Sequence, residues 1–320
     1  MKINIVFTVI LLLAQMLGAG ATEAAAGQET EITLTTPTGE IFGTLTTPEQ
    51  TNQTPATVPV ALIIAGSGPT DRNGNNPAMR NDSLKLLAAA LAQNGIASVR
   101  YDKRGIAASK ASGKSEADLR FENYIDDARA WIQKLRQDRR FSTITVIGHS
   151  EGSLIGMVAA NTADKFVSVA GAGEPADEIL KTQLLAKPQA VQDLCFPIID
   201  SLKNGQTVAD VDPALYSLFR PSVQPYMISW FRYDPQIEIK KLTIPSLIVQ
   251  GTGDIQISVE DGRRLSAADP RAQLVLIEQM NHIFRIVAGD RAANVATYNN
   301  ASLPIADKLV KSISDFILKN

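Results

Sequence analysis

The chain has 320 residues, of which 45% are hydrophobic and 20% are charged, and its formal net charge is −2. This balance is typical of a globular protein with a substantial core and excludes a disordered chain. A nearly neutral charge without long runs of one sign argues against a protein that binds nucleic acid. The single cysteine, Cys195, excludes an internal disulfide and is expected to be buried.

Residues 1–21 have the pattern of a secretory signal peptide. Lys2 is followed by an apolar run from Ile3 to Leu17, and small residues then lead to Ala21, where we predict cleavage. The run is short for a membrane span, which needs about 20 apolar residues, so an uncleaved anchor is the less favoured alternative. We expect an exported protein, periplasmic or secreted, with no membrane attachment after cleavage of the signal.

The next predicted elements form a hairpin and then an alternating series. Two strands rich in Thr and Ile, Glu31–Thr36 and Ile41–Thr46, flank a turn at 37–39. Apolar strands then alternate with amphipathic helices, in the order strand 58–65, helix 83–94, strand 96–101, helix 121–135, strand 143–147, helix 151–161 and strand 166–170. The alternation resumes after an interruption with strand 245–250, helix 259–267, strand 273–277 and a final helix over 305–317.

This alternation predicts an α/β fold with a mostly parallel sheet and helices on both faces. The core is predicted over residues 28–172 and 242–320, and the helical, loop-rich stretch 173–241 is predicted to be a cap insertion. Aromatic residues are concentrated in that insertion, where they could line an apolar substrate pocket or pack the cap's own small core. The aromatic residues proposed for the pocket are Tyr216, Phe219, Tyr226, Trp230 and Phe231.

Residues 148–152 read GHSEG, which is the pattern G-x-S-x-G, and the context of the pattern is more informative than the pattern itself. It follows a buried strand and precedes an apolar helix, as a nucleophile elbow requires. The sharp turn needs small residues two positions before and after the serine, and Gly148 and Gly152 satisfy this. A plain glycine-rich turn between strand and helix is the alternative. We predict that Ser150 is a catalytic nucleophile.

A serine hydroxyl needs a base near neutral pH, and the chain has only two histidines. His149 lies beside Ser150 in the elbow and is expected to point elsewhere because of the turn. His282 follows strand 273–277 at the carboxyl end of the sheet, where sites of α/β proteins gather. We therefore predict His282 as the base, and a surface histidine in a loop is the alternative.

The imidazole needs a carboxylate that holds its tautomer. Asp254 follows strand 245–250, and the order Ser150, Asp254, His282 is the chain order of the triad in α/β-hydrolases. Glu174 and Asp177, which follow strand 166–170, are the alternative acids, and an aspartate in a glycine-rich turn can also serve the turn alone.

The oxyanion of an acyl-transfer intermediate needs two preorganised N–H donors. We predict the backbone N–H of Glu151, next after the nucleophile, and that of Ser67 in the loop GSGP at 66–69. A tight turn without a catalytic role is the alternative for that loop. The charged stretch Asp102-Lys103-Arg104 could contact substrate, but ion pairs and a turn are its favoured role.

Five segments resemble bacterial α/β-hydrolases of the carboxylesterase, dienelactone hydrolase and serine aminopeptidase group. They are residues 65–75, 100–105, 148–152, 245–254 and 281–282. The resemblance implies an α/β-hydrolase fold, esterase activity on small acyl esters, and no cofactor or metal. One position departs from the family pattern, because Ala65 stands where the oxyanion loop commonly begins with histidine. This removes a side-chain role there but leaves the backbone donor at Ser67.

The leading hypothesis is hydrolysis of carboxylic esters with a small to medium acyl chain through an acyl-enzyme. The expected partner is a small-molecule ester, with no nucleic acid, and the oligomeric state stays open. An exopeptidase or acyltransferase would use the same triad, and a non-catalytic binding protein of the same fold is the alternative of another class.

Overall fold

The computed structural model describes residues 27–50, 55–113 and 115–319; the predicted signal peptide, residues 1–21, lies outside them. Within this part the strands form one sheet in the order β1-β2-β4-β3-β5-β6-β7-β8. The first two strands form an antiparallel hairpin that pairs antiparallel with β4, and the other neighbours run parallel. The strands are β1 (Gln28–Thr36), β2 (Gly39–Thr47), β3 (Val58–Ile64), β4 (Ala97–Tyr101), β5 (Phe141–His149), β6 (Lys165–Val169), β7 (Ser246–Gly251) and β8 (Gln273–Ile277).

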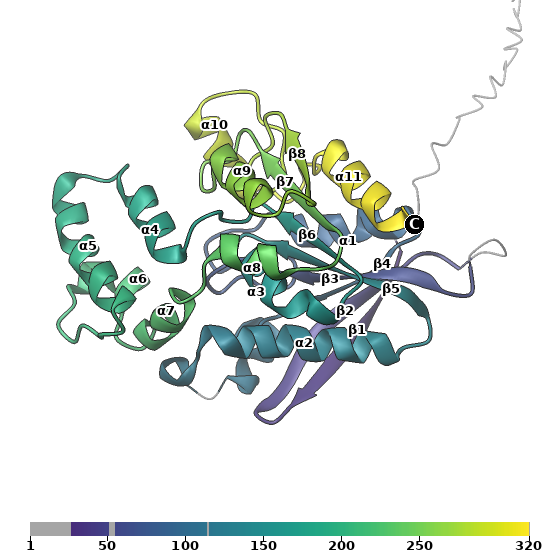
Figure 1. Ribbon diagram of the computed structural model, residues 1–320, viewed down its shortest axis with the longest axis horizontal. Coiled ribbons are helices and arrows are strands. Elements are labelled where there is room, and N and C mark those ends of the chain that lie inside the picture. Colours follow the sequence, from purple (N-terminus) through teal and green to yellow (C-terminus); the bar gives the residue numbers. More distant parts are fainter. Residues whose placement is uncertain (1–26, 51–54, 114, 320) are drawn as a thin grey trace, which may run out of the picture.

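Helices cover both faces of the sheet, which confirms the predicted fold class (Figure 1). The α-helices are α1 (Ser83–Gln93), α2 (Phe121–Gln137), α3 (Glu151–Ala159), α4 (Ala176–Leu184), α5 (Gln189–Lys203), α6 (Tyr216–Phe219), α7 (Gln224–Trp230), α8 (Pro235–Lys241), α9 (Val259–Ala268), α10 (Arg291–Ala296) and α11 (Asp307–Leu318). Short 3₁₀ helices are η1 (Ala107–Ser112), η2 (Glu116–Asp118), η3 (Ala160–Thr162), η4 (Pro213–Leu215) and η5 (Thr297–Asn299).

The central strand β3 shows why the parallel strands appear in the sequence as continuous apolar runs. Val60 and Leu62 belong to the core layer that contains α2 and α3, whereas Ala61 and Ile63 belong to the layer that contains α1 and α11. Successive side chains of a strand point to opposite faces, so a strand covered on both faces needs apolar residues at every position. The predicted strands outside the cap are all found, and the largest shift of an end is at β1, which begins at Gln28 rather than Glu31.

The helices α4 to α7 lie beyond the sheet and share a small core of their own, although α7 also packs on α2 and places Tyr226 in the main core (Figure 1). Cys195, Ile199 and Phe219 are among its buried residues. Helix α8 instead packs on α3 and α9, and its Ile239 is buried in the main core. The structure therefore places α8 with the core, although the prediction included it in the insertion 173–241. No strand separates α8 from α7, so the sequence pattern could not divide them.

Across residues 27–50, 55–113 and 115–319, no helix has the length and apolar character needed to cross a bilayer.

Candidate active site

Ser150 lies in the sharp turn between β5, which ends at His149, and α3, which begins at Glu151. Its backbone angles, φ 55° and ψ −121°, are strained for a residue with a Cβ atom. A Cβ atom on Gly148 would collide with the carbonyl oxygen of Gly152, and one on Gly152 would collide with the backbone of β3. The two glycines are therefore required by close backbone packing, and the turn presents Ser150 at the carboxyl end of the sheet.

His282 and Asp254 are brought together from the loops that follow β8 and β7. The Nδ1 atom of His282 is 2.8 Å from Oδ2 of Asp254, and both side chains are buried. The other carboxylate oxygen of Asp254 accepts backbone N–H groups from Gln256 at 2.8 Å and Ile257 at 3.0 Å. Burial acts to raise the pKa of Asp254, but the His282 charge and these hydrogen bonds together hold it below its usual value. An ionised Asp254 accepts a hydrogen bond from Nδ1–H of His282, which leaves Nε2 without a proton and free to act as a base.

Close backbone contacts hold these two loops in register. A Cβ atom on Gly251 would collide with the carbonyl oxygen of Met280, and that oxygen also accepts the N–H of Gly253 at 3.0 Å. Asn294 of α10 donates from Nδ2 to the carbonyl oxygen of Gly253 at 2.7 Å, and its Oδ1 accepts a hydrogen bond from Nδ2 of Asn281 at 3.2 Å. The prediction did not include Asn294, because α10 carries no motif in the sequence that links it to the site.

His149 supports the position of His282 from the elbow. Its Nε2 atom is 2.9 Å from the carbonyl oxygen of His282, and the two rings lie 4.8 Å apart. A carbonyl oxygen only accepts, so Nε2 of His149 must carry the proton. Burial, followed by the nearby His282 charge, lowers the pKa of His149 to about 3, so the ring stays neutral. The ring adjacent to Ser150 thus contacts the backbone and ring of His282, a contact that the sequence reasoning missed.

The two alternative acids have other partners. Glu174 pairs with Arg264 at 3.3 Å, and Asp177 pairs with Lys203 at 2.9 Å. Of the three carboxylates considered from the sequence, the structure places only Asp254 against His282.

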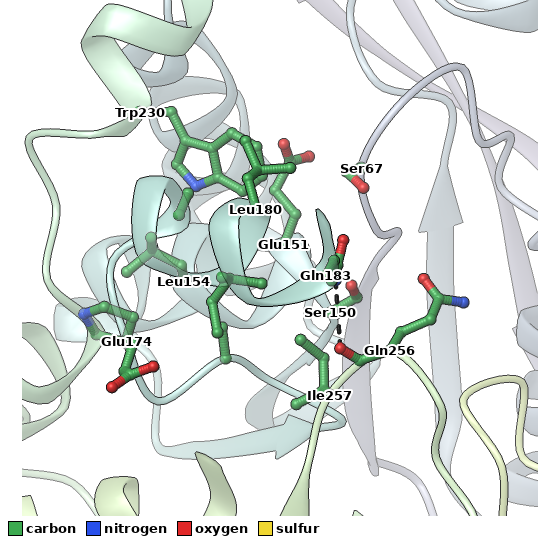
Figure 2. A pocket seen from close by; sticks show the side chains of 14 residues that line it. Ser67, Ser150, Glu151, Leu154, Glu174, Leu180, Gln183, Trp230, Gln256 and Ile257 are labelled. Atoms are coloured by element: carbon green, nitrogen blue, oxygen red, sulfur yellow. Dashed lines mark hydrogen bonds between the residues drawn. The ribbon is translucent and has the colours of Figure 1, made fainter. Parts of the chain in front are cut away.

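The loop that follows β3 lies against the elbow. A Cβ atom on Gly66 would be 3.1 Å from Cβ of Ser150, a distance that leaves little room for a side chain. Ser67 and Glu151, the two residues predicted to donate backbone N–H groups to an oxyanion, line the same cavity as Ser150. Figure 2 shows Ser67 and Glu151 beside the serine.

The three charged residues that follow β4 form buried contacts with other loops. Asp102 accepts the backbone N–H of Arg72 at 2.7 Å, and Lys103 donates to the carbonyl oxygen of Gly66 at 2.6 Å. Arg104 pairs with Asp127. None of the three lines the cavity described below. These contacts agree with the structural role that was favoured from the sequence.

The cavity beside Ser150 is enclosed mainly by apolar side chains from α3, from the cap helix α4 and from the loop after Asp254 (Figure 2). Gln183 of α4 crosses it, with Nε2 3.2 Å from the carbonyl oxygen of Gln256. The lining residues are Ser67, Ser150, Glu151, Leu154, Ala172, Glu174, Ala176, Ile179, Leu180, Gln183, Trp230, Pro235, Gln256 and Ile257.

No group of three or more His, Cys, Asp or Glu side chains in the described part of the chain is arranged to hold a metal ion.

Trp230 is the one predicted pocket aromatic that lines this cavity. Phe219 and Phe231 are buried in the small core of the cap, and Tyr226 is buried in the main core. Tyr216 is 42% exposed. The pocket prediction is therefore wrong for these four residues with respect to this cavity. Which core each ring joins depends on how the short helices pack, and an aromatic cluster in a sequence does not reveal this.

Comparisons with known proteins show which family and which structures this chain is similar to. The family described as serine aminopeptidase, S33, matches residues 81–226, just under half of the chain, including Ser150. The α/β-hydrolase GrgF from Penicillium sp. sh18 has a similar structure, with a TM-score of 0.59 at 17% identity, over 91% of this chain and 98% of that one. This chain shares the fold of that α/β-hydrolase.

Two further similarities concern esterase EstD and Est1E. The chain is 25% identical over 252 residues to esterase EstD of Thermotoga maritima, a match that covers 75% of this chain and 57% of that protein. The chain thus spans little more than half the length of this relative. Est1E from Butyrivibrio proteoclasticus has a TM-score of 0.61 at 18% identity, over 91% of this chain and 99% of that one.

Proposed function

We propose that this chain is an α/β-hydrolase that acts as a serine esterase and cleaves carboxylic esters of small to medium acyl chain. The observation that carries the proposal is the buried pair of His282 and Asp254, with Nδ1 2.8 Å from Oδ2. The imidazole of His282 lies against the ring of His149, the neighbour of the strained Ser150. A nucleophile, a base and an orienting carboxylate are the requirements of acyl transfer through a serine. The similarity to a protein named as an esterase supports the same activity.

The proposal gives each residue of the triad a role. Ser150 Oγ attacks the ester carbonyl, and Nε2 of His282 takes its proton and delivers it to the leaving alcohol. Asp254 holds the imidazole tautomer and stabilises the imidazolium. A water molecule, activated by His282, then attacks the acyl-enzyme, and the acid leaves as Ser150 recovers its proton.

The oxyanion of each tetrahedral intermediate would be held by the backbone N–H groups of Ser67 and Glu151, which flank Ser150 in the cavity. Each such donor lowers the barrier by about 3 kcal/mol in serine hydrolases, because it is oriented before charge develops.

The cavity wall supports the assignment of the acyl group. Leu154, Leu180 and Ile257 present apolar surface beside Ser150, and Trp230 closes the far side (Figure 2). Such a wall favours an unbranched or aromatic acyl group over a charged one, because burial of a charge without a partner is unfavourable.

A second candidate is an aminopeptidase, since the carboxylate of Glu174 also lines the cavity and could bind a substrate ammonium group. Arg264 already pairs with Glu174 at 3.3 Å, which offsets its charge and favours the ester as substrate. Hydrolysis rates for an aminoacyl p-nitroanilide and the matching aminoacyl ester separate the two candidates. An esterase is expected to cleave the ester much faster, and Glu174→Gln is expected to leave that rate unchanged.

Labelling with a fluorophosphonate tests the proposal directly, because only an activated serine reacts. The full chain is expected to be labelled at Ser150, as located by mass spectrometry of its peptides, and to hydrolyse p-nitrophenyl acetate through octanoate. Absence of both labelling and turnover would leave a non-catalytic binding protein of this fold as the better description.

We also propose export, on the composition of residues 1–21 alone. The full chain is expressed in a bacterium, and the amino terminus of the periplasmic or secreted product is sequenced. This product is expected to begin at residue 22. An intact amino terminus in the cytoplasm would contradict it.

A further inference from the structure

Lys103 is a buried lysine that joins the two backbone segments on either side of the nucleophile. Its Nζ atom donates to the carbonyl oxygen of Gly66 at 2.6 Å and to Oε2 of Glu151 at 2.8 Å. The side chains of Lys103 and Glu151 are each 1% exposed. The other carboxylate oxygen of Glu151 accepts the hydroxyl of Tyr226 at 2.6 Å, and the ammonium group lies 4.8 Å from the ring centre of Tyr124. The ammonium is thus surrounded by partners, as a buried charge requires.

The contact with Gly66 controls the direction of a predicted oxyanion donor. The carbonyl group of Gly66 and the N–H of Ser67 belong to one peptide unit, which is planar and trans. In such a unit the C=O and N–H bonds point in opposite directions, so a hydrogen bond that holds the oxygen also sets the direction of the N–H. A cationic donor on the oxygen further polarises the N–H and strengthens it as a donor.

The contact with Glu151 links the same lysine to the second donor. Glu151 supplies its backbone N–H, whereas its carboxylate is held by Lys103 and Tyr226 behind the cavity wall. The two proposed oxyanion donors therefore share one anchor, although they come from loops after β3 and β5. Lys103 itself is not among the described residues that line the cavity, so it does not touch substrate there.

We propose that Lys103 is a positioning residue of the oxyanion hole, which fixes the Ser67 N–H through the carbonyl oxygen of Gly66 and the Glu151 segment through its carboxylate. This inference rests on the proposed esterase function. It predicts that loss of the ammonium weakens binding of the transition state more than binding of the ester.

The main test is Lys103→Met in the full chain, which removes the ammonium and retains most of the side-chain volume. With p-nitrophenyl butyrate we expect kcat to fall by about 10- to 100-fold, less than the loss of a whole donor, while KM changes by less than about threefold. Rates are divided by the concentration of sites titrated to completion with a fluorophosphonate, so that misfolded protein does not count.

A transition-state analogue gives a readout that stability alone does not move. A trifluoromethyl ketone forms a hemiketal oxyanion on the serine, and its affinity for Lys103→Met is expected to fall by the same factor as kcat/KM. The affinity of the carboxylate product, which binds without an oxyanion, is expected to change by less than about threefold.

Two further variants serve as a control and as a second measurement. Arg104→Met removes the adjacent buried ion pair with Asp127, which has no contact with Gly66 or Glu151, and is expected to lower Tm while preserving kcat per titrated site. Glu151→Gln retains the backbone N–H and an acceptor for Lys103 but removes the charge that pairs with the ammonium, so it is expected to lower kcat by about three- to tenfold, less than Lys103→Met. It also provides the measurement if Lys103→Met does not fold.

The proposal is overturned if kcat per titrated site of Lys103→Met, or of Glu151→Gln where only that variant folds, stays within twofold of the unmodified chain. It is also overturned if ketone and product affinities fall equally. If the unmodified chain neither reacts with the fluorophosphonate nor hydrolyses esters, the proposed function fails instead, and the two failures are distinct.

Discussion

The two walls of the cavity are built in different ways. On the core side, which carries the lining residue Ser150 and the loops of Asp254 and His282, backbone packs directly on backbone, and glycines such as Gly152 and Gly251 stand where a Cβ atom would collide with a neighbouring carbonyl group. The opposite wall is formed by cap helices that have a small core of their own.

The cap meets the core near the cavity mainly through side chains. One contact joins the hydroxyl of Tyr226 to Glu151 at 2.6 Å, and another joins Gln183 to the carbonyl oxygen of Gln256 at 3.2 Å. Side chains can be exchanged with little effect on the backbone, whereas a contact between backbone segments cannot. We therefore expect the core wall to fix the proposed chemistry and the cap wall to adjust the choice of substrate.

The largest effect is expected at the nucleophile. Ser150→Ala should lower kcat for p-nitrophenyl butyrate by about 10⁵-fold or more, because no other hydroxyl can replace it in the elbow. Ser153→Ala, one turn along α3, removes a buried hydroxyl that bonds Ser168 at 2.7 Å and should keep kcat within about threefold. Measurement of kcat for both purified variants decides this. If Ser150→Ala is as active as Ser153→Ala, the core wall does not supply the nucleophile.

The second effect concerns the acid. Asp254→Asn should lower kcat by about 10³- to 10⁴-fold, because an amide in place of the carboxylate no longer favours the required tautomer of His282. Asp177→Asn, at an alternative acid on the cap side, should leave kcat within about threefold. A larger loss from Asp177→Asn than from Asp254→Asn, measured at equal concentrations of folded protein, would reverse the comparison.

The third effect concerns His149 on the core wall, whose titration makes the stability of the protein depend on pH. His149 has a folded pKa of about 3 against an ordinary value of 6.5, so only the unfolded chain takes up this proton in that range. Stability should therefore fall as pH drops from about 6.5 towards 3, by up to about 1.4 kcal/mol per pH unit from this group.

His149→Gln keeps an N–H donor for the carbonyl oxygen of His282 and lacks the titration. Urea unfolding at pH 7, 6, 5 and 4 should show a shallower loss of stability for this variant than for the unmodified chain. The lowered pKa of Asp254 contributes stability that is lost as pH falls below the usual carboxyl range, but both proteins share it. Equal slopes would show that His149 is not held neutral.

The smallest effect is expected on the cap wall. Trp230→Leu should raise KM for p-nitrophenyl octanoate about fivefold, from loss of about 1 kcal/mol of apolar contact, and change kcat for the acetate by less than twofold. Tyr216→Ala, on the exposed side of the cap, should change neither. A large loss of kcat for the acetate in Trp230→Leu would mean that the cap also contributes to the chemistry.

Much of the core could be predicted because the relevant signals are local. Apolar runs such as residues 58–65 follow from burial on both faces, and the elbow is recognisable because Gly148 and Gly152 flank Ser150 at fixed spacing. The scarcity of histidine made His282 a candidate, and Asp254 followed from its place after a strand. The pairing of these two side chains agrees with what parallel strands imply, since their carboxyl ends share one edge.

The sequence by itself determined the alternating fold, the elbow and the small set of residues able to act as base and acid. The tertiary structure alone decided which rings reach the cavity, that α8 packs with the core, and that Lys103 holds Gly66 and Glu151. The reason is the range of the interactions. Periodicity and turn chemistry act over a few residues, whereas Lys103 and Gly66 are 37 positions apart and His149 and His282 are 133 apart. Such pairs meet only once the sheet has set the distances between its loops.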